Sequence, residues 1–305
     1  MEASAGSTAT LEGEPVLSLR GVSKGFGAVQ ALTDIDLDIY PREVVAIVGD
    51  NGAGKSTLVK VLAGVHAQDS GTITFEGNPV DIPSPSAAQA LGIATVFQDL
   101  ALCDNLDVVS NLFLGREITH GTLNEEEMEK RSWELLRQLS AKIPSVRIAV
   151  ASLSGGQRQT VAIARSLVGN PSVILLDEPT AALGVAQTAE VLNLVERLRE
   201  NGLGVVLISH NMADVQAVAD RVVVLRLGRN NGVFRVPDVS YEDIIAAITG
   251  ATDNAVTRRE AHVAESQLAD SNRAAPAVSG GNLSTTDLPA SDSNPAKPSE
   301  EGTHA

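Results

Sequence analysis

Apolar and polar residues alternate along the early part of the chain. Ile35, Leu37 and Ile39 are separated by aspartates, which predicts a strand with one apolar face and one face in water. Residues 44–48 instead form a continuous apolar run rich in β-branched side chains, as in a strand buried on both faces. A glycine-rich turn follows this run, and residues 55–63 have the pattern of a helix.

Two later segments repeat the buried pattern. Residues 173–176 and 205–208 are short apolar runs, and residues 189–200 between them carry apolar side chains at helical spacing. Because strands alternate with helices, we expect an α/β fold with a largely parallel sheet. Residues 99–168 differ and look mostly helical, with Asn124 as the N-cap of a helix whose first turn is rich in glutamate.

The two ends of the chain differ from its centre. Residues 1–14 are small and polar, and residues 251–305 are rich in Ala, Ser, Asn, Asp and Pro without any aromatic side chain. Such segments cannot bury enough apolar surface to offset the entropy of ordering. We expect a flexible N-terminus, one domain over residues 15–250, and a disordered tail in which a short helix over residues 258–268 is the alternative.

Composition limits the class of protein. Hydrophobic residues make up 43% of the 305-residue chain, which excludes a wholly disordered protein. The longest apolar runs span a few residues, whereas crossing a bilayer takes about 20, and the first residues lack the features of a secretory signal. Cys103 is the single cysteine and cannot form an internal disulfide. The net charge of −15 argues against broad binding of nucleic-acid phosphates, so no nucleic-acid partner is expected.

The strongest chemical signal is the glycine-rich turn before the helix at 55–63. Its sequence, GDNGAGKS, fits the pattern G-x-x-x-x-G-K-[ST], in which backbone N–H groups turn toward phosphate oxygens. Lys55 would supply a cation to the β- and γ-phosphates and Ser56 a ligand to Mg²⁺. A plain turn with a stray lysine is the alternative, but the position between a buried strand and a helix favours phosphate binding. The residues expected to bind the nucleotide here are Gly49, Asp50, Asn51, Gly52, Ala53, Gly54, Lys55, Ser56 and Thr57.

Two carboxylates follow the apolar run at 173–176. Asp177 would stand at the tip of the strand and hold Mg²⁺ directly or through water. Glu178 would then orient and polarise an attacking water. Many strands end in acidic turns, so this motif alone is weak evidence for a metal site. Its position after a phosphate loop in the same chain strengthens that interpretation.

A third motif, LSGGQ, occupies residues 153–157. Ser154 is a good N-cap, so a capped helix is the simplest interpretation. In the functional interpretation, the Ser154 hydroxyl and the Gly155 and Gly156 amides bind phosphate at the helix N-terminus. The two phosphate-binding helix starts need not face the same nucleotide in the same subunit.

Together these motifs resemble the nucleotide-binding subunit of ATP-binding cassette (ABC) transporters. The resemblance covers about residues 16–250, with Walker A at 49–57, the LSGGQ signature through Gln157, and Walker B at 173–178. It implies an α/β P-loop NTPase cassette with a mainly parallel core sheet, an antiparallel β subdomain, and a helical subdomain at about 99–168.

The resemblance also assigns roles to three isolated residues. Gln98 matches the Q-loop, whose amide would sense Mg²⁺ and the attacking water, and His210 matches the switch histidine that contacts the γ-phosphate. Phe26 stands where the family has an aromatic ring stacked on adenine. Alone, these residues would more often be a solvated amide, a capping histidine and a core or turn aromatic. Gln98 and His210 each follow an apolar strand in motif order, which favours the functional roles, whereas for Phe26 both interpretations stay open.

The family further implies an ATP hydrolase that works as a head-to-tail homodimer. ATP on one subunit would meet Ser154 and Gly156 of the other. A multi-helix membrane permease would dock near residues 99–116 and hold the chain at the cytoplasmic face of the membrane, with an extracytoplasmic solute-binding protein in the same system. The apolar residues expected to form a socket for the permease, or else to pack inside the helical subdomain, are Leu100, Leu102, Leu106, Leu112 and Phe113.

One departure and one subfamily resemblance refine this picture. Gly184 stands where the family usually has an aspartate after Walker B, so we expect altered communication between the two sites or an altered hydrolysis rate. Residues 178–185 are nevertheless similar to sugar-importer cassettes of the ribose, xylose and fructose type, and a single cassette resembles the fructose type. A soluble ABC-type ATPase in translation, repair or cofactor assembly, or the cassette of a separate-chain exporter, is the alternative.

Overall fold

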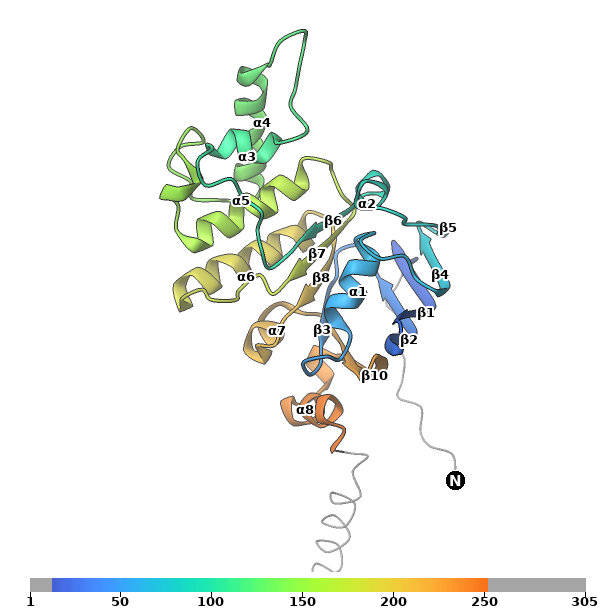
Figure 1. Ribbon diagram of the computed structural model, residues 1–305. Helices are drawn as coiled ribbons and strands as arrows, with labels where there is room; N and C mark the ends of the chain where they lie inside the picture. Colours follow the sequence, from blue (N-terminus) through green and yellow to red (C-terminus); the bar gives the residue numbers. More distant parts are fainter. Residues whose placement is uncertain (1–12, 252–305) are drawn as a thin grey trace, which may run out of the picture. The chain divides into compact units, whose positions relative to one another are not determined.

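The structure is a computed structural model that describes residues 13–251 (Figure 1). It contains two β-sheets. The larger sheet has six strands in the order β10-β9-β3-β8-β7-β6, and the smaller has four in the order β2-β1-β4-β5. Residues 1–12 and 252–305 lie outside the described part. The expected flexible N-terminus and disordered tail, with its alternative helix, therefore fall almost wholly outside it.

The six-stranded sheet contains the buried strands predicted from the sequence. Its pairings are parallel except for the antiparallel hairpin of the last two strands. Every residue of β3 and β8 is buried, because helices or the second sheet cover both faces. The strands are β3 (Val44–Val48), β6 (Ile93–Val96), β7 (Val173–Asp177), β8 (Gly204–Ile208), β9 (Arg221–Arg226) and β10 (Arg229–Arg235).

The four-stranded sheet is antiparallel throughout, as expected for the β subdomain. Ile35, Leu37 and Ile39 are buried, which confirms the predicted alternation. They share one apolar cluster with Val45 and Ile47 of the larger sheet. The strands are β1 (Leu17–Phe26), β2 (Val29–Ile39), β4 (Ser70–Phe75) and β5 (Asn78–Val80).

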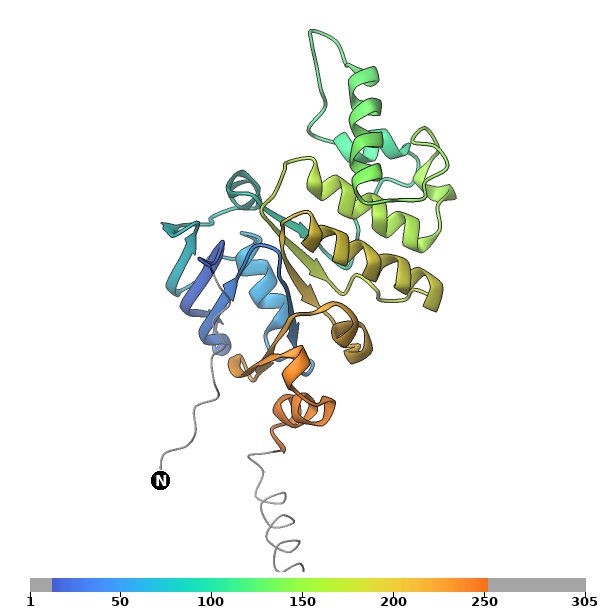
Figure 2. The same ribbon diagram turned by 180° about the vertical axis from the view of Figure 1, so that it is seen from behind.

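Helices cover the larger sheet on both sides. Helix α1 packs in the cluster that includes the small sheet, while α5 and α6 lie side by side on the opposite face (Figure 1 and Figure 2). No helix among residues 13–251 is long and apolar enough to span a bilayer. The helices are α1 (Lys55–Leu62), α2 (Pro85–Leu91), α3 (Val108–Phe113), α4 (Glu125–Gln138), α5 (Gly155–Leu167), α6 (Val185–Glu200), α7 (Met212–Val218) and α8 (Tyr241–Thr249), with 3-10 turns at Val150–Ser152 and Val236–Asp238.

Helices α3, α4 and α5 form the helical subdomain that the sequence predicts. The side chain of Asn124 accepts a hydrogen bond from the Glu127 N–H at 3.1 Å, which confirms the predicted N-cap of α4. Helix α6 starts earlier than predicted, because its exposed first turns carry no apolar periodicity. Residues 99–107 contain no helix. The fully buried Asn111 side chain forms hydrogen bonds with the backbone of Cys103, Leu106 and Asp107 instead, which holds this segment as a loop.

The expected apolar socket is only partly present. Leu112 and Phe113 are each 1% exposed and pack in the interior of the helical subdomain, so their assignment to a permease-facing surface is wrong. Leu100, Leu102 and Leu106 are half-buried. The turn of α3 that precedes the exposed residue Leu114 points its apolar side chains at α5, where they lose contact with water.

A buried ion pair joins the two sheets. Glu43, just before β3, and Arg221, at the start of β9, lie 2.7 Å apart between Oε1 and Nε and 2.9 Å apart between Oε2 and Nη2. The Arg221 guanidinium also donates to the Asp38 carbonyl of β2 at 2.5 Å. The two side chains are 12% and 3% exposed for arginine and glutamate, so water does not screen them.

The substitution Glu43→Gln should lower the free energy of unfolding by about 3–5 kcal/mol, because it leaves the arginine charge buried and unpaired. Urea denaturation of the full chain measures this loss. Arg229→Gln is the matched control: the pair of Arg229 with Asp34 is 60% and 71% exposed, and such pairs contribute about 0–1 kcal/mol. Equal losses in the two variants would show that the buried pair does not join the sheets.

Candidate nucleotide-binding site

The predicted motifs converge at one edge of the six-stranded sheet. The glycine-rich loop follows β3, Gln98 follows β6, Asp177 and Glu178 end β7, and His210 follows β8. These four strands are parallel and adjacent in the order β3-β8-β7-β6, so their carboxyl ends meet at the same edge. Ligands of open α/β sheets bind outside this edge.

The glycine-rich loop between β3 and α1 requires its glycines. Gly49, Gly52 and Gly54 all have positive φ angles, of 152°, 80° and 105°. A Cβ on Gly49 would lie 2.2 Å from the Leu225 carbonyl oxygen, so no other side chain fits there. Lys55 is buried, and its Nζ donates to the carbonyl oxygens of Gly49 at 2.6 Å and Asp50 at 3.0 Å. The lysine is therefore folded back across the loop.

The charges of Lys55, Asp177 and Glu178 influence one another. Burial lowers the pKa of Lys55, and the charges of Glu178, Asp50 and Asp177 oppose that shift. Burial and the neighbouring Glu178 raise the pKa of Asp177, against the opposing charges of Lys60 and Lys55. The site thus holds negatively charged carboxylates in a place where burial disfavours the charged form. A cation bound there would stabilise them.

Glu178 and His210 meet although they are distant in the sequence. The Glu178 N–H donates to the Ile208 carbonyl of β8 at 3.0 Å, and Nδ1 of His210 lies 3.2 Å from Oε1 of Glu178. Glu178 has a φ of 48°, a left-handed conformation that is unusual outside glycine. The pairing of Asp177 with Ile208 across β7 and β8 sets this contact.

Asp214 on α7 supports the same loops, and no sequence signal pointed to it. It is 5% exposed and accepts hydrogen bonds from the Thr180 hydroxyl at 2.6 Å and the Asn211 side-chain amide at 3.0 Å. These bonds join the turn after Glu178 to the turn after His210. The carboxylate is therefore a positioning group for both loops.

A cavity of about 780 Å³ opens beside these groups. It is lined by Asp50, Glu178 and His210 on one side and by Tyr241 and Ile245 of α8 on the other. The sequence analysis missed this apolar wall, because α8 is a short helix next to the compositional change at residue 250 and carries no recognisable motif.

Phe26 lies apart from that cavity, near the end of β1. Its ring is 44% exposed, so it is not a core aromatic. The His66 ring packs edge-on at a centroid distance of 5.0 Å, and Nζ of Lys24 lies 5.5 Å from the Phe26 centroid. An exposed, supported ring of this kind suits stacking on a base.

The signature residues lie at the start of α5 and are not part of this subunit's own phosphate loop. The Ser154 hydroxyl accepts from the Gln157 N–H at 3.3 Å, and the Gln157 side chain accepts from the Ser154 N–H at 3.0 Å. Gly155 and Gly156 pack against Leu183 and Gln187. Across residues 13–251, no hydrogen bond or ion pair joins this helix start to residues 49–57. The capped helix is thus present.

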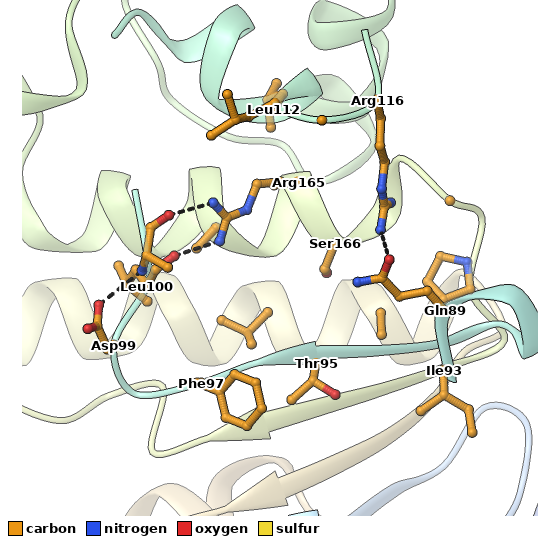
Figure 3. A pocket seen from close by; sticks show the side chains of 18 residues that line it. Gln89, Ile93, Thr95, Phe97, Asp99, Leu100, Leu112, Arg116, Arg165 and Ser166 are labelled. Atoms are coloured by element: carbon orange, nitrogen blue, oxygen red, sulfur yellow. Dashed lines mark hydrogen bonds between the residues drawn. The ribbon is translucent and has the colours of Figure 1, made fainter. Parts of the chain in front are cut away.

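Gln98 is exposed at the end of β6, and Arg165 of α5 fixes the loop that follows it. The Arg165 guanidinium donates to the carbonyls of Leu100 at 2.6 Å and Ala101 at 2.7 Å, and the Asp99 carboxylate accepts from the Ala101 N–H at 3.0 Å (Figure 3). The sequence analysis did not identify Arg165, because nothing in the chain order places a residue near the end of α5 beside residues 100 and 101.

The described residues offer three groups suited to Mg²⁺, of which Gln98 is exposed in the loop after β6. Ser56 is exposed at the start of α1, and Asp177 is half-buried at the end of β7. No group of three or more His, Cys, Asp or Glu residues within 13–251 could hold a metal ion. This set fits Mg²⁺, which is commonly bound by one or two carboxylates together with substrate phosphates.

Fold and site together define an α/β P-loop ATPase. The sequence pattern of the ABC transporter family matches residues 32–181. The fructose import ATP-binding protein FrcA of Rhizobium meliloti is 44% identical over 249 residues, which cover 79% of this chain and 96% of that protein. The xylose/arabinose import ATP-binding protein XylG of Sulfolobus acidocaldarius is 45% identical over 235 residues, which cover 77% and 94%. The chain therefore belongs to the ABC transporter family and is an ATP hydrolase of that family.

Solved structures agree with the expected cassette fold. The ADP conformation of MJ1267, an ATP-binding cassette of an ABC transporter, has a TM-score of 0.68 at 26% identity and covers 78% of this chain and 96% of that chain. The dimeric post-hydrolysis state of the cassette MJ0796, bound to ADP and phosphate, has a TM-score of 0.61 at 27% identity, covering 72% and 98%.

The substitution Lys55→Ala should weaken ATP binding by about 10- to 100-fold, since it removes a charge-assisted contact with the phosphates. Isothermal titration calorimetry with ATP measures the change. Lys130→Ala, which removes an exposed lysine of α4, is the control and should leave the affinity within about threefold. An unaltered affinity in Lys55→Ala would contradict the assignment of the loop as the phosphate site.

Proposed function

We propose that this chain is the ATPase subunit of a membrane importer for a small solute, and that the solute is a monosaccharide. The observation that carries the proposal is the meeting of Lys55, Asp177, Glu178 and His210 at one edge of the sheet, in a chain 44% and 45% identical to two sugar-import ATP-binding proteins. The same relatives favour import over a soluble ATPase or an exporter cassette.

ATP binds along the loop after β3. The backbone N–H groups of residues 49–54 and the N-terminus of α1 surround the phosphates, and Lys55 places its ammonium between them. Phe26 stacks on the adenine, a contact worth about 1–3 kcal/mol by analogy with other base–aromatic stacks. Ser56, Asp177 and Gln98 would hold Mg²⁺, which would neutralise phosphate charge.

Glu178 polarises the water that attacks the γ-phosphate. Its carboxylate is half-buried, and His210 stands 3.2 Å away. His210 holds that carboxylate in place and reaches toward the γ-phosphate from the neighbouring strand. The left-handed backbone at Glu178 aims its side chain away from the strand direction and into the site.

A second copy of the chain completes the site. The capped start of α5 carries backbone N–H groups and the positive end of the helix dipole, and within residues 13–251 no hydrogen bond joins it to the loop at 49–57. Ser154, Gly155, Gly156 and Gln157 of one subunit therefore bind the nucleotide held by the other. ATP then favours the closed dimer, and loss of the γ-phosphate removes that preference.

The permease docks at the helical subdomain. A cavity of about 380 Å³ lies among β6, α5 and residues 112–116, beside the loop that follows Gln98 (Figure 3). Through this contact the chain is held at the cytoplasmic face of the membrane. An extracytoplasmic binding protein delivers the solute to the permease.

The substitution Glu178→Gln should lower ATP hydrolysis by about 100-fold or more, because general-base assistance contributes at least that much. ATP binding should persist, and the variant should form a stable dimer with ATP. Phosphate release and size-exclusion chromatography measure the two effects. Asp238→Asn, a change in an exposed residue of the 3-10 turn before α8, serves as the control. Hydrolysis by Glu178→Gln at the unmutated rate would show that another group activates the water.

Sugar uptake by cells that lack the chain tests the proposed import function. Loss of the chain should abolish uptake of a radiolabelled sugar from a set that contains fructose, xylose and ribose. The unmutated gene should restore uptake, and Glu178→Gln should not. If every sugar enters equally well without the chain, the proposed import of a monosaccharide is wrong.

Gly184 offers a test of communication between the two ATP sites. It precedes α6 with a φ of −75°, and nothing lies within 4 Å of the position a Cβ would take, so larger residues fit. The substitution Gly184→Asp should raise the Hill coefficient of ATP hydrolysis, because it adds the carboxylate that this family usually has there. Gly184→Asn is the control, since it caps the helix equally well without the charge. The idea fails if both variants keep the unmutated Hill coefficient.

A further inference from the structure

Asp214, in the first turn of α7, is a buried carboxyl group that takes no direct part in the proposed hydrolysis. Its exposed fraction is 5%. In the part of the chain that the structure describes, no lysine, arginine or histidine nitrogen lies within 4 Å of its oxygens. Burying a carboxylate without a cation costs free energy, which its hydrogen bonds must offset. The bonds of this group therefore show what it does.

The two oxygens of Asp214 accept hydrogen bonds from two different turns. Oδ2 accepts from the Thr180 hydroxyl at 2.6 Å, and Oδ1 accepts from the Asn211 side-chain amide at 3.0 Å. Thr180 lies two residues after Glu178, and Asn211 directly follows His210. One carboxylate thus joins the turns that carry the two residues proposed to act on the γ-phosphate and its attacking water.

The turn after Glu178 needs such an external contact. Glu178 has a φ of 48° and Ala182 a φ of 59°, so the backbone is left-handed at two non-glycine residues of this short segment. Such a conformation costs free energy and persists only where the surroundings hold it. Thr180 lies between these two residues, and its hydroxyl bond to Asp214 is one of the contacts that hold the turn.

The turn after His210 is the more firmly fixed of the two. The Asn211 side chain caps α7 by accepting from the Ala213 N–H at 3.0 Å, while its amide nitrogen donates to Asp214. The Ser209 hydroxyl accepts from the Asn211 N–H at 3.0 Å. The capped start of α7 is therefore a fixed support, and the bond from Asp214 to Thr180 extends that support to the turn after Glu178.

We propose that Asp214 is a positioning residue for ATP hydrolysis, which acts through Thr180 to hold the Glu178 carboxylate beside His210. The inference rests on the proposed function, which assigns Glu178 and His210 their roles. Oε1 of Glu178 lies 3.2 Å from Nδ1 of His210, and a displacement of about 1 Å at such a contact can lower a rate by about 100-fold. The loop at 49–57 binds ATP without this bond, so its loss affects kcat and spares affinity.

The substitution Thr180→Val tests the role, because it removes the hydroxyl and keeps the shape of the side chain. We expect kcat in the full chain, measured by phosphate release, to fall at least about tenfold. The Kd for ATP, measured by calorimetry, should stay within about threefold of the unmutated value. Thr180→Ser keeps the hydroxyl and should retain kcat. Asp214→Leu should reproduce the effect of Thr180→Val, which decides the matter by itself if the leucine variant does not fold.

Ser132→Ala is the matched control for the loss of one buried hydrogen bond. Ser132 is fully buried in α4, and its hydroxyl donates to the Met128 carbonyl at 2.7 Å. This change should lower the melting temperature, as Thr180→Val does, and leave kcat within about twofold, because it lies in the helical subdomain outside the catalytic groups. Thr180→Val added to Glu178→Gln should cause no further loss of rate, because both changes act through the same carboxylate.

Four results would overturn the positioning role of Asp214. They are an unaltered kcat in Thr180→Val, an equal loss of kcat in Ser132→Ala, a Kd that rises in step with the fall in kcat, and a further loss of rate in the Glu178→Gln background. Each of these leaves the proposed function intact. Hydrolysis by Glu178→Gln at the unmutated rate is a different failure, since it removes the proposed role of Glu178 and the inference with it.

Discussion

The parallel pairing of β3, β8, β7 and β6 is the constraint on which the rest of the structure depends. Ala46 pairs with Leu207, and Leu207 pairs with Leu176, so three strands from distant parts of the chain end at the same level. A shift of this register would separate Glu178 from His210 and move both away from the loop after β3. The burial of nearly every residue in these strands keeps the register fixed.

Helix α5 runs between the two surfaces of the helical subdomain that are proposed to contact other molecules. Its N-terminus carries the signature residues from Ser154 onward, and its last turns carry Arg165, which holds the loop after Gln98. Its buried face contains Val161, Ile163 and Ala164, which pack in the larger apolar cluster of the core.

The start of α5 presents backbone N–H groups and the positive end of the helix dipole. This helix end suits an anionic group, and the proposed function assigns to it the phosphates of a nucleotide held by a second copy of the chain. In the fold, α5 and the loop after β6 lie between the proposed catalytic groups at the edge of the sheet and the proposed permease contact at the helical subdomain.

The sequence by itself determined the local features of this protein. Short β-branched runs marked β3, β7 and β8, a capping asparagine marked α4, and the glycine spacing marked the phosphate loop, because each of these depends on neighbouring residues alone. Tertiary structure decided the rest. Contacts between segments that are remote in the sequence produce three features. These are the ion pair of Glu43 with Arg221, the hydrogen bonds of Arg165 to the loop after Gln98, and the inward packing of Leu112 and Phe113. An apolar residue looks the same in sequence whether it faces a partner or its own core, and only the packing of α3 on α5 settled which of the two applies.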